Sequence, residues 1–281
     1  MKILLTGRDG QVGWELVRAL PALGELVATD RAGLDLFYPD LIRQAVRYAK
    51  PDVIVNAAAY TAVDRAESEP DMAMEVNGVA AGVLAEEAKR LGALLVHYST
   101  DYVFDGTNKV AYLETDEPRP LNAYGRTKLE GEKRVAASGC RHLILRTSWV
   151  YAPRGKNFFL TIAKKARAGE PLRVVNDQHG APTEARFIAE TTLELVQGGH
   201  EGLFNVVPSG ETTWHGFARA ILERLHSNVP LASISSSEYP TPARRPAYSV
   251  LSTGKISRTL GKPPPAWETL LERCVKVWTS A

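Results

Sequence analysis

Tyr124 and Lys128 are the two side chains whose types and spacing most clearly suggest chemistry. In a helix, residues four apart lie on one face, so this phenol and this ammonium would be neighbours. An unperturbed tyrosine has a pKa near ~10, high for proton donation at neutral pH, and a nearby positive charge lowers it. Reduction of a ketone needs such a proton donor. Because Tyr-x-x-x-Lys also occurs by chance in many helices, the surrounding segments must decide.

A glycine-rich loop follows the first apolar segment and contains Gly7, Gly10 and Gly13 at three-residue spacing. Such glycines permit a tight turn and a close approach of the backbone to a pyrophosphate, which then lies at the N-terminus of the next helix. Asp30 ends the second apolar segment, where an acid can bind the hydroxyls of an adenosine ribose. Glycines alone could merely close a helix onto a strand, but the combination predicts a bound dinucleotide.

The charges near this loop leave the choice of cofactor open. Asp30 repels the additional phosphate of NADP, whereas Arg8 and Arg31 attract it. We therefore expect NADPH or NADH.

Thr100 and Asp101 directly follow another apolar segment, at the edge where parallel sheets bind ligands. A hydroxyl in this place can hydrogen-bond a substrate carbonyl. Thr100 could instead cap a turn, as Ser, Thr and Asp often do. The position at the end of a central strand favours a functional role.

The elements that must position these side chains alternate between strands and helices. Short, nearly continuous apolar runs predict strands that are covered on both faces. We expect strands at about residues 2–6, 25–29, 53–56, 94–99 and 143–147, and helices at about 11–20, 39–49, 71–90 and 124–137. This order predicts an α/β fold with a doubly wound, Rossmann-type parallel sheet.

Beyond Ser148 the alternation becomes irregular and predicts a smaller C-terminal substrate-binding lobe. We expect helices at about 157–168, 186–197 and 214–225, strands at 172–175 and 202–206, and a last helix after Trp267. We therefore divide the chain into a dinucleotide-binding domain, 1–147, which part of 171–200 rejoins, and a lobe mainly formed by 148–281.

Composition excludes several other classes of protein. The formal net charge of +2 in 281 residues gives no field that favours nucleic acid, and no apolar run reaches membrane-spanning length. Only two cysteines and no secretory signal indicate a cytoplasmic protein. The six histidines lack metal-ligand spacing, so we expect them to be ordinary surface or packing residues.

The order of these motifs resembles the extended short-chain dehydrogenase/reductase family. It comprises the glycine loop, Asn56–Ala59 after the third strand, a hydroxyl after the fourth, and then Tyr124 with Lys128. Within that family, five segments closely resemble the dTDP-4-dehydrorhamnose reductases: Tyr60–Glu67, Ser99–Gly106, Arg146–Tyr151, Asn176–Thr183 and Arg245–Ser249. The resemblance covers essentially the whole chain.

The resemblance implies roles for individual residues. Tyr124 would donate a proton to the C4 oxygen of a sugar, while Lys128 would lower the tyrosine pKa and hold the nicotinamide ribose. Thr100, where serine is usual, would hydrogen-bond the reacting oxygen. Asp101 would touch the sugar and Trp149 would pack on its face, although a half-buried core tryptophan explains Trp149 equally well. The positions that line the cofactor in the family are here Gly7, Gly10, Gln11, Val12, Gly13, Asp30, Asp35, Leu36, Ala59, Tyr60, Thr61, Tyr98, Tyr124 and Lys128.

The activity that the resemblance implies is reduction of the C4 keto group of dTDP-4-dehydro-6-deoxy-L-mannose to dTDP-L-rhamnose, for cell-surface polysaccharide. One alternative is a nucleotide-sugar epimerase or dehydratase of the same superfamily, but dehydratases usually place a Glu after the acid that corresponds to Asp101, and none follows here. Another is a non-catalytic regulatory subunit similar to the methionine adenosyltransferase beta subunit. Retention of Tyr124, Lys128 and Thr100 disfavours it.

One departure from the family concerns a metal. Some of these reductases bridge a homodimer through magnesium held by acidic residues. Glu15 matches one of these acids, but Arg186 occupies the place of another, and a cation is a poor neighbour for a metal. We therefore expect no required metal, and a homodimer is left open.

Overall fold

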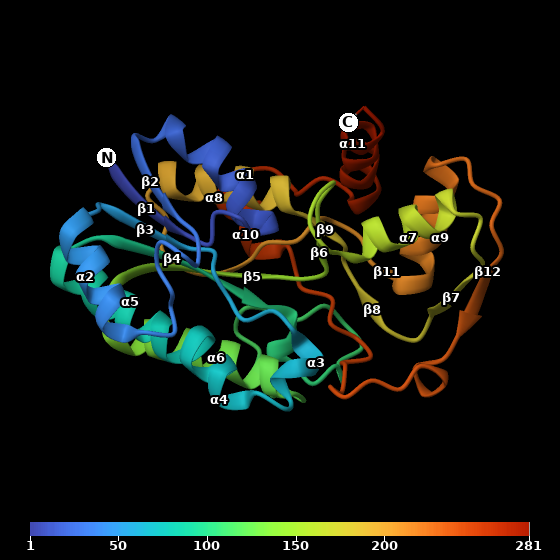
Figure 1. The fold of residues 1–281 in the computed structure, drawn as a ribbon, viewed down its shortest axis with the longest axis horizontal. Coiled ribbons are helices and arrows are strands. Elements are labelled where there is room, and N and C mark those ends of the chain that lie inside the picture. The colour runs from blue at the N-terminus through green and yellow to red at the C-terminus, as the bar shows by residue number, and fades with distance from the viewer. Residues whose placement is uncertain (281) are drawn as a thin grey trace.

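The computed structural model describes residues 1–280 and contains a six-stranded parallel sheet in the order β10-β5-β4-β3-β1-β2. Its strands are β1 (Lys2–Thr6), β2 (Glu25–Thr29), β3 (Val53–Asn56), β4 (Leu94–Thr100), β5 (Arg141–Thr147) and β10 (Gly202–Asn205). Figure 1 shows the sheet and its helices on one side of the molecule and the C-terminal lobe on the other. The predicted α/β, doubly wound fold is confirmed.

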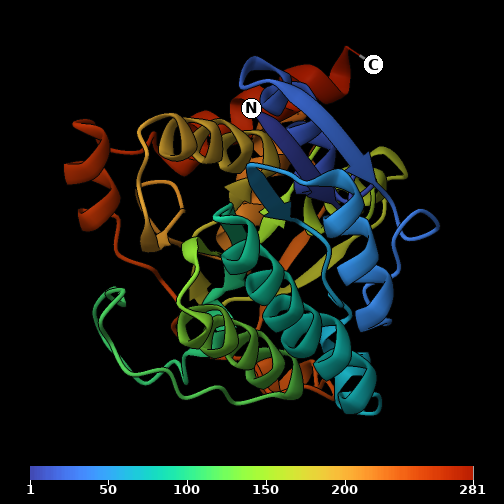
Figure 2. The same cartoon turned by 90° about the vertical axis from the view of Figure 1, so that its left-hand side faces the viewer.

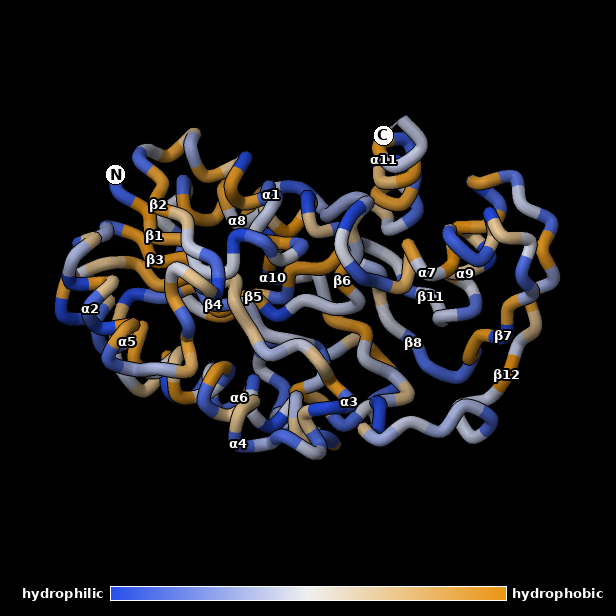
Figure 3. Tube along the Cα trace, viewed as in Figure 1, coloured by the Kyte–Doolittle hydropathy of each residue, from blue (hydrophilic) through white to orange (hydrophobic). Residues whose placement is uncertain are grey.

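Alternate residues of the strands point to opposite faces of the sheet and belong to two separate hydrophobic cores. Val53 and Val55 belong to the core beneath α1 (Gln11–Ala19) and α8 (Ala185–Gln197), whereas Ile54 belongs to the core beneath α2 (Pro39–Ala49), α5 (Ala80–Leu91) and α6 (Ala123–Ser138). Figure 2 shows helices on both faces of the sheet, and Figure 3 shows hydrophobic residues along β1, β2 and β3. Burial on both faces explains why the strands are almost continuously apolar.

The C-terminal lobe has a third core, in which Tyr151, Phe159, Phe217, Trp267 and Leu271 are buried. The lobe comprises α7 (Phe158–Arg167), α9 (Trp214–Arg224), α11 (Trp267–Thr279) and the parallel pair β7 (Leu172–Val175) and β12 (Leu231–Ile234). Shorter pairs are β6 (Val150–Tyr151) with β9 (Thr183–Glu184), and β8 (His179–Gly180) with β11 (Thr212–Thr213). β10 and α8 lie in sequence between lobe segments yet pack with the sheet.

Several elements differ from the sequence expectations. The helix expected at 71–90 is α4 (Pro70–Met74), a π-helical turn at Glu75–Val79, and α5 in succession. Two short helices, α3 (Val63–Ala66) and α10 (Gly254–Leu260), were not expected, because four and seven residues show too little periodicity. Within residues 1–280, no helix is long and apolar enough to cross a membrane.

Candidate active site

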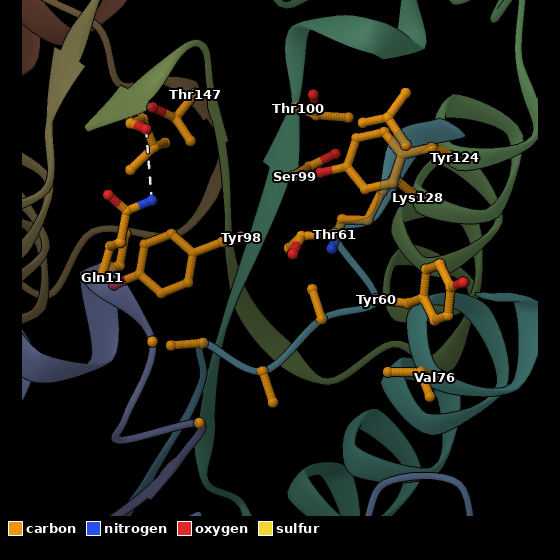
Figure 4. A pocket seen from close by; sticks show the side chains of 18 of the residues that line it. Gln11, Tyr60, Thr61, Val76, Tyr98, Ser99, Thr100, Tyr124, Lys128 and Thr147 are labelled. Atoms are coloured by element: carbon orange, nitrogen blue, oxygen red, sulfur yellow. Dashed lines mark hydrogen bonds between the residues drawn. The ribbon is translucent and has the colours of Figure 1, made fainter. Parts of the chain in front are cut away.

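A cavity of about 860 Å³ lies at the carboxyl edge of the sheet and extends to the lobe. Figure 4 shows Tyr124 and Lys128 on α6, Ser99 and Thr100 at the end of β4, and Gln11 at the start of α1, all around this cavity. Of the residues proposed from the sequence for cofactor, substrate or catalysis, all but Gly13 line this cavity. They are Gly7, Gly10, Gln11, Val12, Asp30, Asp35, Leu36, Ala59, Tyr60, Thr61, Tyr98, Thr100, Asp101, Tyr124, Lys128 and Trp149. Folding therefore gathers one candidate site from segments over a hundred residues apart.

The glycine loop has the geometry that a phosphate cradle requires. Gly7 has φ +74°, a left-handed conformation that favours glycine, and a Cβ on Gly13 would lie 2.0 Å from the Gly7 carbonyl oxygen. Gly13 thus acts by packing α1 against the loop rather than by lining the cavity. No side chain caps Gly10 at the α1 N-terminus in the described chain, so the first amides of the helix can receive a phosphate.

Asp30 lines the cavity and directly follows β2. Its Oδ1 accepts a hydrogen bond from the Gly33 amide at 2.8 Å. Nearby, Arg31 is paired with Asp35 at 3.2 Å. The carboxyl group is therefore fixed in orientation by its own turn, and its other oxygen can accept from a ligand.

Asn122 fixes the start of α6, where Tyr124 lies. Its Oδ1 accepts from the Gly125 amide at 2.8 Å, and its Nδ2 donates to the Arg244 carbonyl at 2.8 Å. One turn later Lys128 is 2% exposed, and its Nζ lies 3.5 Å from His97 Nε2. The helix thus presents a phenol and a buried amine to the cavity.

The pKa values in this pair differ from the sequence expectation. Burial raises the pKa of Tyr124 to about 12, the charge of Asp101 acts in the same direction, and a hydrogen bond with Thr100 opposes it. Burial also lowers the pKa of Lys128 to about 8, while Glu132 raises it. Desolvation therefore dominates the pKa of Tyr124 in this structure. The lowering of that pKa by Lys128 stays a prediction.

Thr100 ends β4 and takes part in several hydrogen bonds. Its Oγ1 accepts from the Tyr102 amide at 3.1 Å, so it does cap the short turn at 101–103. The same hydroxyl donates to Asp101 Oδ1 at 3.1 Å, and it lines the cavity together with Tyr124. The capping role and a role in the site are therefore compatible.

Trp149 follows β5 in a strained conformation. Its φ of +48° is unusual for a bulky residue, and such strain concentrates at functional sites. Its indole stacks on Trp214 of α9, with centroids 3.7 Å apart and planes 8° from parallel, and lies against Gly180. Both indoles line the cavity. The stack joins the end of the sheet to the lobe.

Two buried residues with contacts in the site were missed from the sequence. His97, expected to be an ordinary surface or packing residue, links Asn56 to Lys128, and burial holds the pKa of its imidazole well below the usual value. Asn77 lies in the π-helical turn and binds both the amide and the carbonyl of Tyr60, at 2.9 and 3.1 Å, and the Thr127 hydroxyl at 3.1 Å. An isolated His or Asn gives no sequence signal, because its partners are distant in the chain.

The donor groups of the cavity fit a nicotinamide dinucleotide. Beyond the glycine loop, the buried hydroxyls of Ser99 and Thr147 line the cavity and have no hydrogen-bond partner among residues 1–280. Unsatisfied buried polar groups are costly, so these hydroxyls are suited to a polar ligand. In the same residues, no group of three or more His, Cys, Asp or Glu side chains could hold a metal ion.

A doubly wound sheet with a glycine loop at its carboxyl edge, facing a Tyr, Lys and Thr constellation, defines the class of extended short-chain dehydrogenase/reductases. Comparison with known sequences narrows this class. The sequence profile of the RmlD substrate binding domain family matches residues 1–280. The dTDP-4-dehydrorhamnose reductase of Burkholderia thailandensis is 48% identical over 293 residues, covering 98% of each chain.

Solved structures agree with this assignment. A dTDP-4-dehydrorhamnose reductase of Clostridium acetobutylicum has a TM-score of 0.96 at 36% identity, covering 99% of this chain and 100% of that one. The reductase of Bacillus anthracis, solved in complex with NADP, has a TM-score of 0.94 at 33% identity over 98% and 99% of the two chains. The chain therefore belongs to the dTDP-4-dehydrorhamnose reductase family.

Proposed function

We propose that this protein reduces the C4 keto group of dTDP-4-dehydro-6-deoxy-L-mannose to give dTDP-L-rhamnose, in dTDP-rhamnose and cell-surface polysaccharide biosynthesis. The observation that carries the proposal is the convergence of Tyr124, Lys128 and Thr100 on one cavity with the glycine loop. A reduced nicotinamide, NADPH or NADH, supplies a hydride there when bound. The family assignment supports the substrate.

The residues of this chain supply the rest of the chemistry. Thr100 orients the C4 oxygen by a hydrogen bond, and Tyr124 gives it a proton as the C4 carbon is reduced. The raised tyrosine pKa keeps the phenol protonated before reaction. Lys128, held by His97, binds the ribose hydroxyls and stabilises the phenolate that remains.

The substrate side of the cavity is assigned to Asp101 and Trp149. The Asp101 carboxyl can accept from a sugar hydroxyl, and the apolar face of a deoxysugar suits an indole. Because Trp214 and Gly180 already contact the Trp149 ring, we expect the sugar to meet its remaining free surface.

We also propose that no metal is required. Arg186, which by the resemblance occupies the place of one metal-binding acid, donates to Glu190 at 2.8 Å, and Arg273 donates to the same carboxylate at 2.9 Å, so guanidinium groups stand at that place. A homodimer, the domain boundaries and a cytoplasmic location stay predictions.

Mixing the pure protein with NADPH or NADH and the 4-keto sugar nucleotide tests the proposal through the absorbance of the reduced nicotinamide. We expect stoichiometric oxidation of the cofactor and formation of dTDP-L-rhamnose. An epimerase would change the sugar without net oxidation, and a regulatory subunit would bind the cofactor without turnover. Either result would replace the reductase assignment, which family membership favours over both.

A further inference from the structure

Arg154 is a cation of the cavity that the proposed mechanism does not use. It lies in the loop of residues 152–157, between β6 and α7, and it lines the cavity. Its side chain is half-buried, and its Nη1 is buried without a hydrogen-bond partner among residues 1–280. Leaving a buried N–H group without an acceptor is costly, so this nitrogen is suited to a ligand that supplies one.

The charge of Arg154 is available to such a ligand. The basic side chains that line the cavity are Arg31, Arg65, Lys128, Arg154 and Lys156. Arg31 and Arg65 are each paired with a carboxylate, at 3.2 and 2.6 Å, and Lys128 belongs to the proposed catalytic group. Arg154 and Lys156 are paired with no acid in the part of the chain that the structure describes. The unpaired positive charge of the cavity therefore lies in the loop 152–157.

Two kinds of contact fix Arg154 beside the start of α1. Its guanidinium carbon lies 3.7 Å from the ring centroid of Trp14, which is in the first turn of α1. The Asn157 Nδ2 donates to the Arg154 carbonyl at 3.0 Å and to Gln11 Oε1 at 2.7 Å. Gln11 is the first residue of α1 and borders the cavity in Figure 4. The protein itself therefore orients the guanidinium group next to the first turn of this helix.

Arg18 is a second arginine on the same indole and provides a comparison. Its guanidinium carbon lies 4.3 Å from the Trp14 centroid, its Nη1 donates to the Trp14 carbonyl at 3.3 Å, and the same nitrogen lies 3.9 Å from Glu15. Arg18 is not among the described residues that line the cavity. The two arginines thus share a stacking partner, but only Arg154 can meet a ligand there.

The anion that suits this position is a pyrophosphate. No side chain caps the N-terminus of α1 within residues 1–280, so its first amides can receive a phosphate. A guanidinium group beside the same helix end adds two parallel donors, a geometry that matches phosphate oxygens. The additional phosphate of NADPH belongs elsewhere, because Asp30 and Arg31 follow β2, where the adenosine ribose is expected.

We propose that Arg154 binds the pyrophosphate of the nicotinamide dinucleotide, in addition to the amides of the glycine loop. This inference rests on the cofactor site of the proposed function and assigns to it a residue of the segment that follows β6. The cofactor is then held both by the loop after β1 and by the chain that leads from Trp149 to α7.

Arg154→Gln removes the charge and is tested by calorimetric titration with NADPH and with NADH. We expect the Kd of both cofactors to rise by about the same factor, roughly tenfold, because they share the pyrophosphate. The difference from wild type should shrink as salt is added, since salt screens a half-exposed charge. Arg154→Lys keeps the charge without the planar fork and should retain part of the affinity.

Arg18→Gln is the matched control, because it removes a positive charge from the same indole. Its Kd for either cofactor should stay within about twofold of wild type, as expected for an exposed charge that meets no ligand. Arg154→Met keeps an unbranched side chain against Trp14 and has the same expected loss as Arg154→Gln. It takes the place of that variant if the glutamine prevents folding, which Tm values reveal.

The pattern of losses decides the outcome. Wild-type affinity for both cofactors in the uncharged variants would make Arg154 a packing residue of Trp14 and overturn the proposal. A loss confined to NADPH would place Arg154 at the additional phosphate. A loss confined to dTDP, titrated in parallel, would place it at the sugar nucleotide, and either result also overturns the proposal. These titrations use no keto sugar, so their outcome is separate from that of the turnover assay for the reductase function.

Discussion

Tyr124→Phe removes a single oxygen atom and leaves the ring and its contacts. If that oxygen carries the transferred proton, kcat should fall by roughly 10²–10⁴-fold, the usual contribution of a positioned general acid. Cofactor affinity, measured by fluorescence titration, should barely change, and so should the Tm. A variant with near-normal kcat on the 4-keto sugar would assign the proton to another group.

Asp30→Ala tests which part of the cofactor this carboxylate meets. The change removes an acceptor for the ribose hydroxyls of NADH and a repulsive charge for the phosphate of NADPH. Preference should therefore move toward NADPH, with NADH binding weakened more. Loss of the bond from the Gly33 amide affects both cofactors alike, so equal losses in paired titrations would place Asp30 away from the ribose.

At the residue scale, sequence could predict side chains whose partners are near in the chain or fixed by a motif. Tyr124 and Lys128 share a helix, and Gly7, Gly10 and Gln11 share one loop, so spacing alone places them together. His97 acquires its role from Lys128, 31 residues away, through the register of the sheet and the packing of α6. The rise of the Tyr124 pKa on burial was not predicted for a related reason, because desolvation depends on the whole cavity.

At the element scale, most helices and strands followed from hydrophobic periodicity, because a two-sided sheet imposes continuous apolar strands. The predicted strand 53–56 and helix 39–49 have the observed bounds. Two-residue strands such as β6 and β9 carry no periodicity and exist only through their mutual pairing. The π-helical turn was missed because a single turn of five residues is too short to show a period of its own.

Asn77, in that π-helical turn, connects two segments of the site by hydrogen bonds. Its side chain holds the backbone of Tyr60, beside the cofactor region, and the Thr127 hydroxyl on α6. Asn77→Ala leaves these buried groups unpaired, and we expect a loss of about 1–3 kcal/mol in the free energy of unfolding. Asn77→Asp is the matched variant, since it keeps the acceptor for the Tyr60 amide, loses the donated bonds and adds a buried carboxyl group beside the Tyr60 carbonyl. Denaturant curves that superimpose on wild type for both would contradict this role.

The Trp149–Trp214 stack connects the segment after β5 to α9. A pair of variants separates a contact with the sugar from packing. Trp149→Ala should lower kcat/KM by about 1–3 kcal/mol of transition-state stabilisation if the indole contacts the sugar. Trp214→Ala removes the stacking partner but leaves Trp149, so its effect on kcat/KM should be smaller. A core tryptophan would instead lose about 3–5 kcal/mol of stability on truncation. If Trp149→Ala melts far lower yet reduces the sugar normally while folded, Trp149 is only packing.

At the scale of the whole molecule, the site depends on contacts that join the sheet to the lobe. Gln11, at the start of α1, donates to the Val150 carbonyl at 3.4 Å and accepts from Asn157 Nδ2 at 2.7 Å. Asn157 also caps α7 through the Leu160 amide at 2.9 Å. The cofactor loop and the lobe are thus held in register by side chains 146 residues apart, a relation that no local pattern encodes.

Stability as a function of pH reports the burial of Asp101 without any ligand. Its pKa is about 7 in the folded protein and about 3.9 in an unfolded chain, so between these values the folded state holds one more proton than the unfolded state. The contribution of Asp101 to the free energy of unfolding is therefore largest below pH ~4. It decreases as pH rises toward 7, with a slope of at most about 1.4 kcal/mol per pH unit. Lys128 has a lowered pKa of about 8, so its contribution changes only at higher pH.

Comparing Tm values of variants isolates this contribution from the rest of the molecule. We expect the Tm of wild type to fall relative to that of Asp101→Asn as pH rises from about 5 to 7, because the amide cannot ionise. Asp105→Asn is the control: the pKa of Asp105 is lowered by hydrogen bonds from Thr107 and Tyr112, so its carboxyl is charged in both states throughout this window. Its Tm should therefore run parallel to that of wild type. Parallel curves for Asp101→Asn as well would mean that Asp101 is already charged in the folded protein at pH 5, so that burial does not raise its pKa as expected.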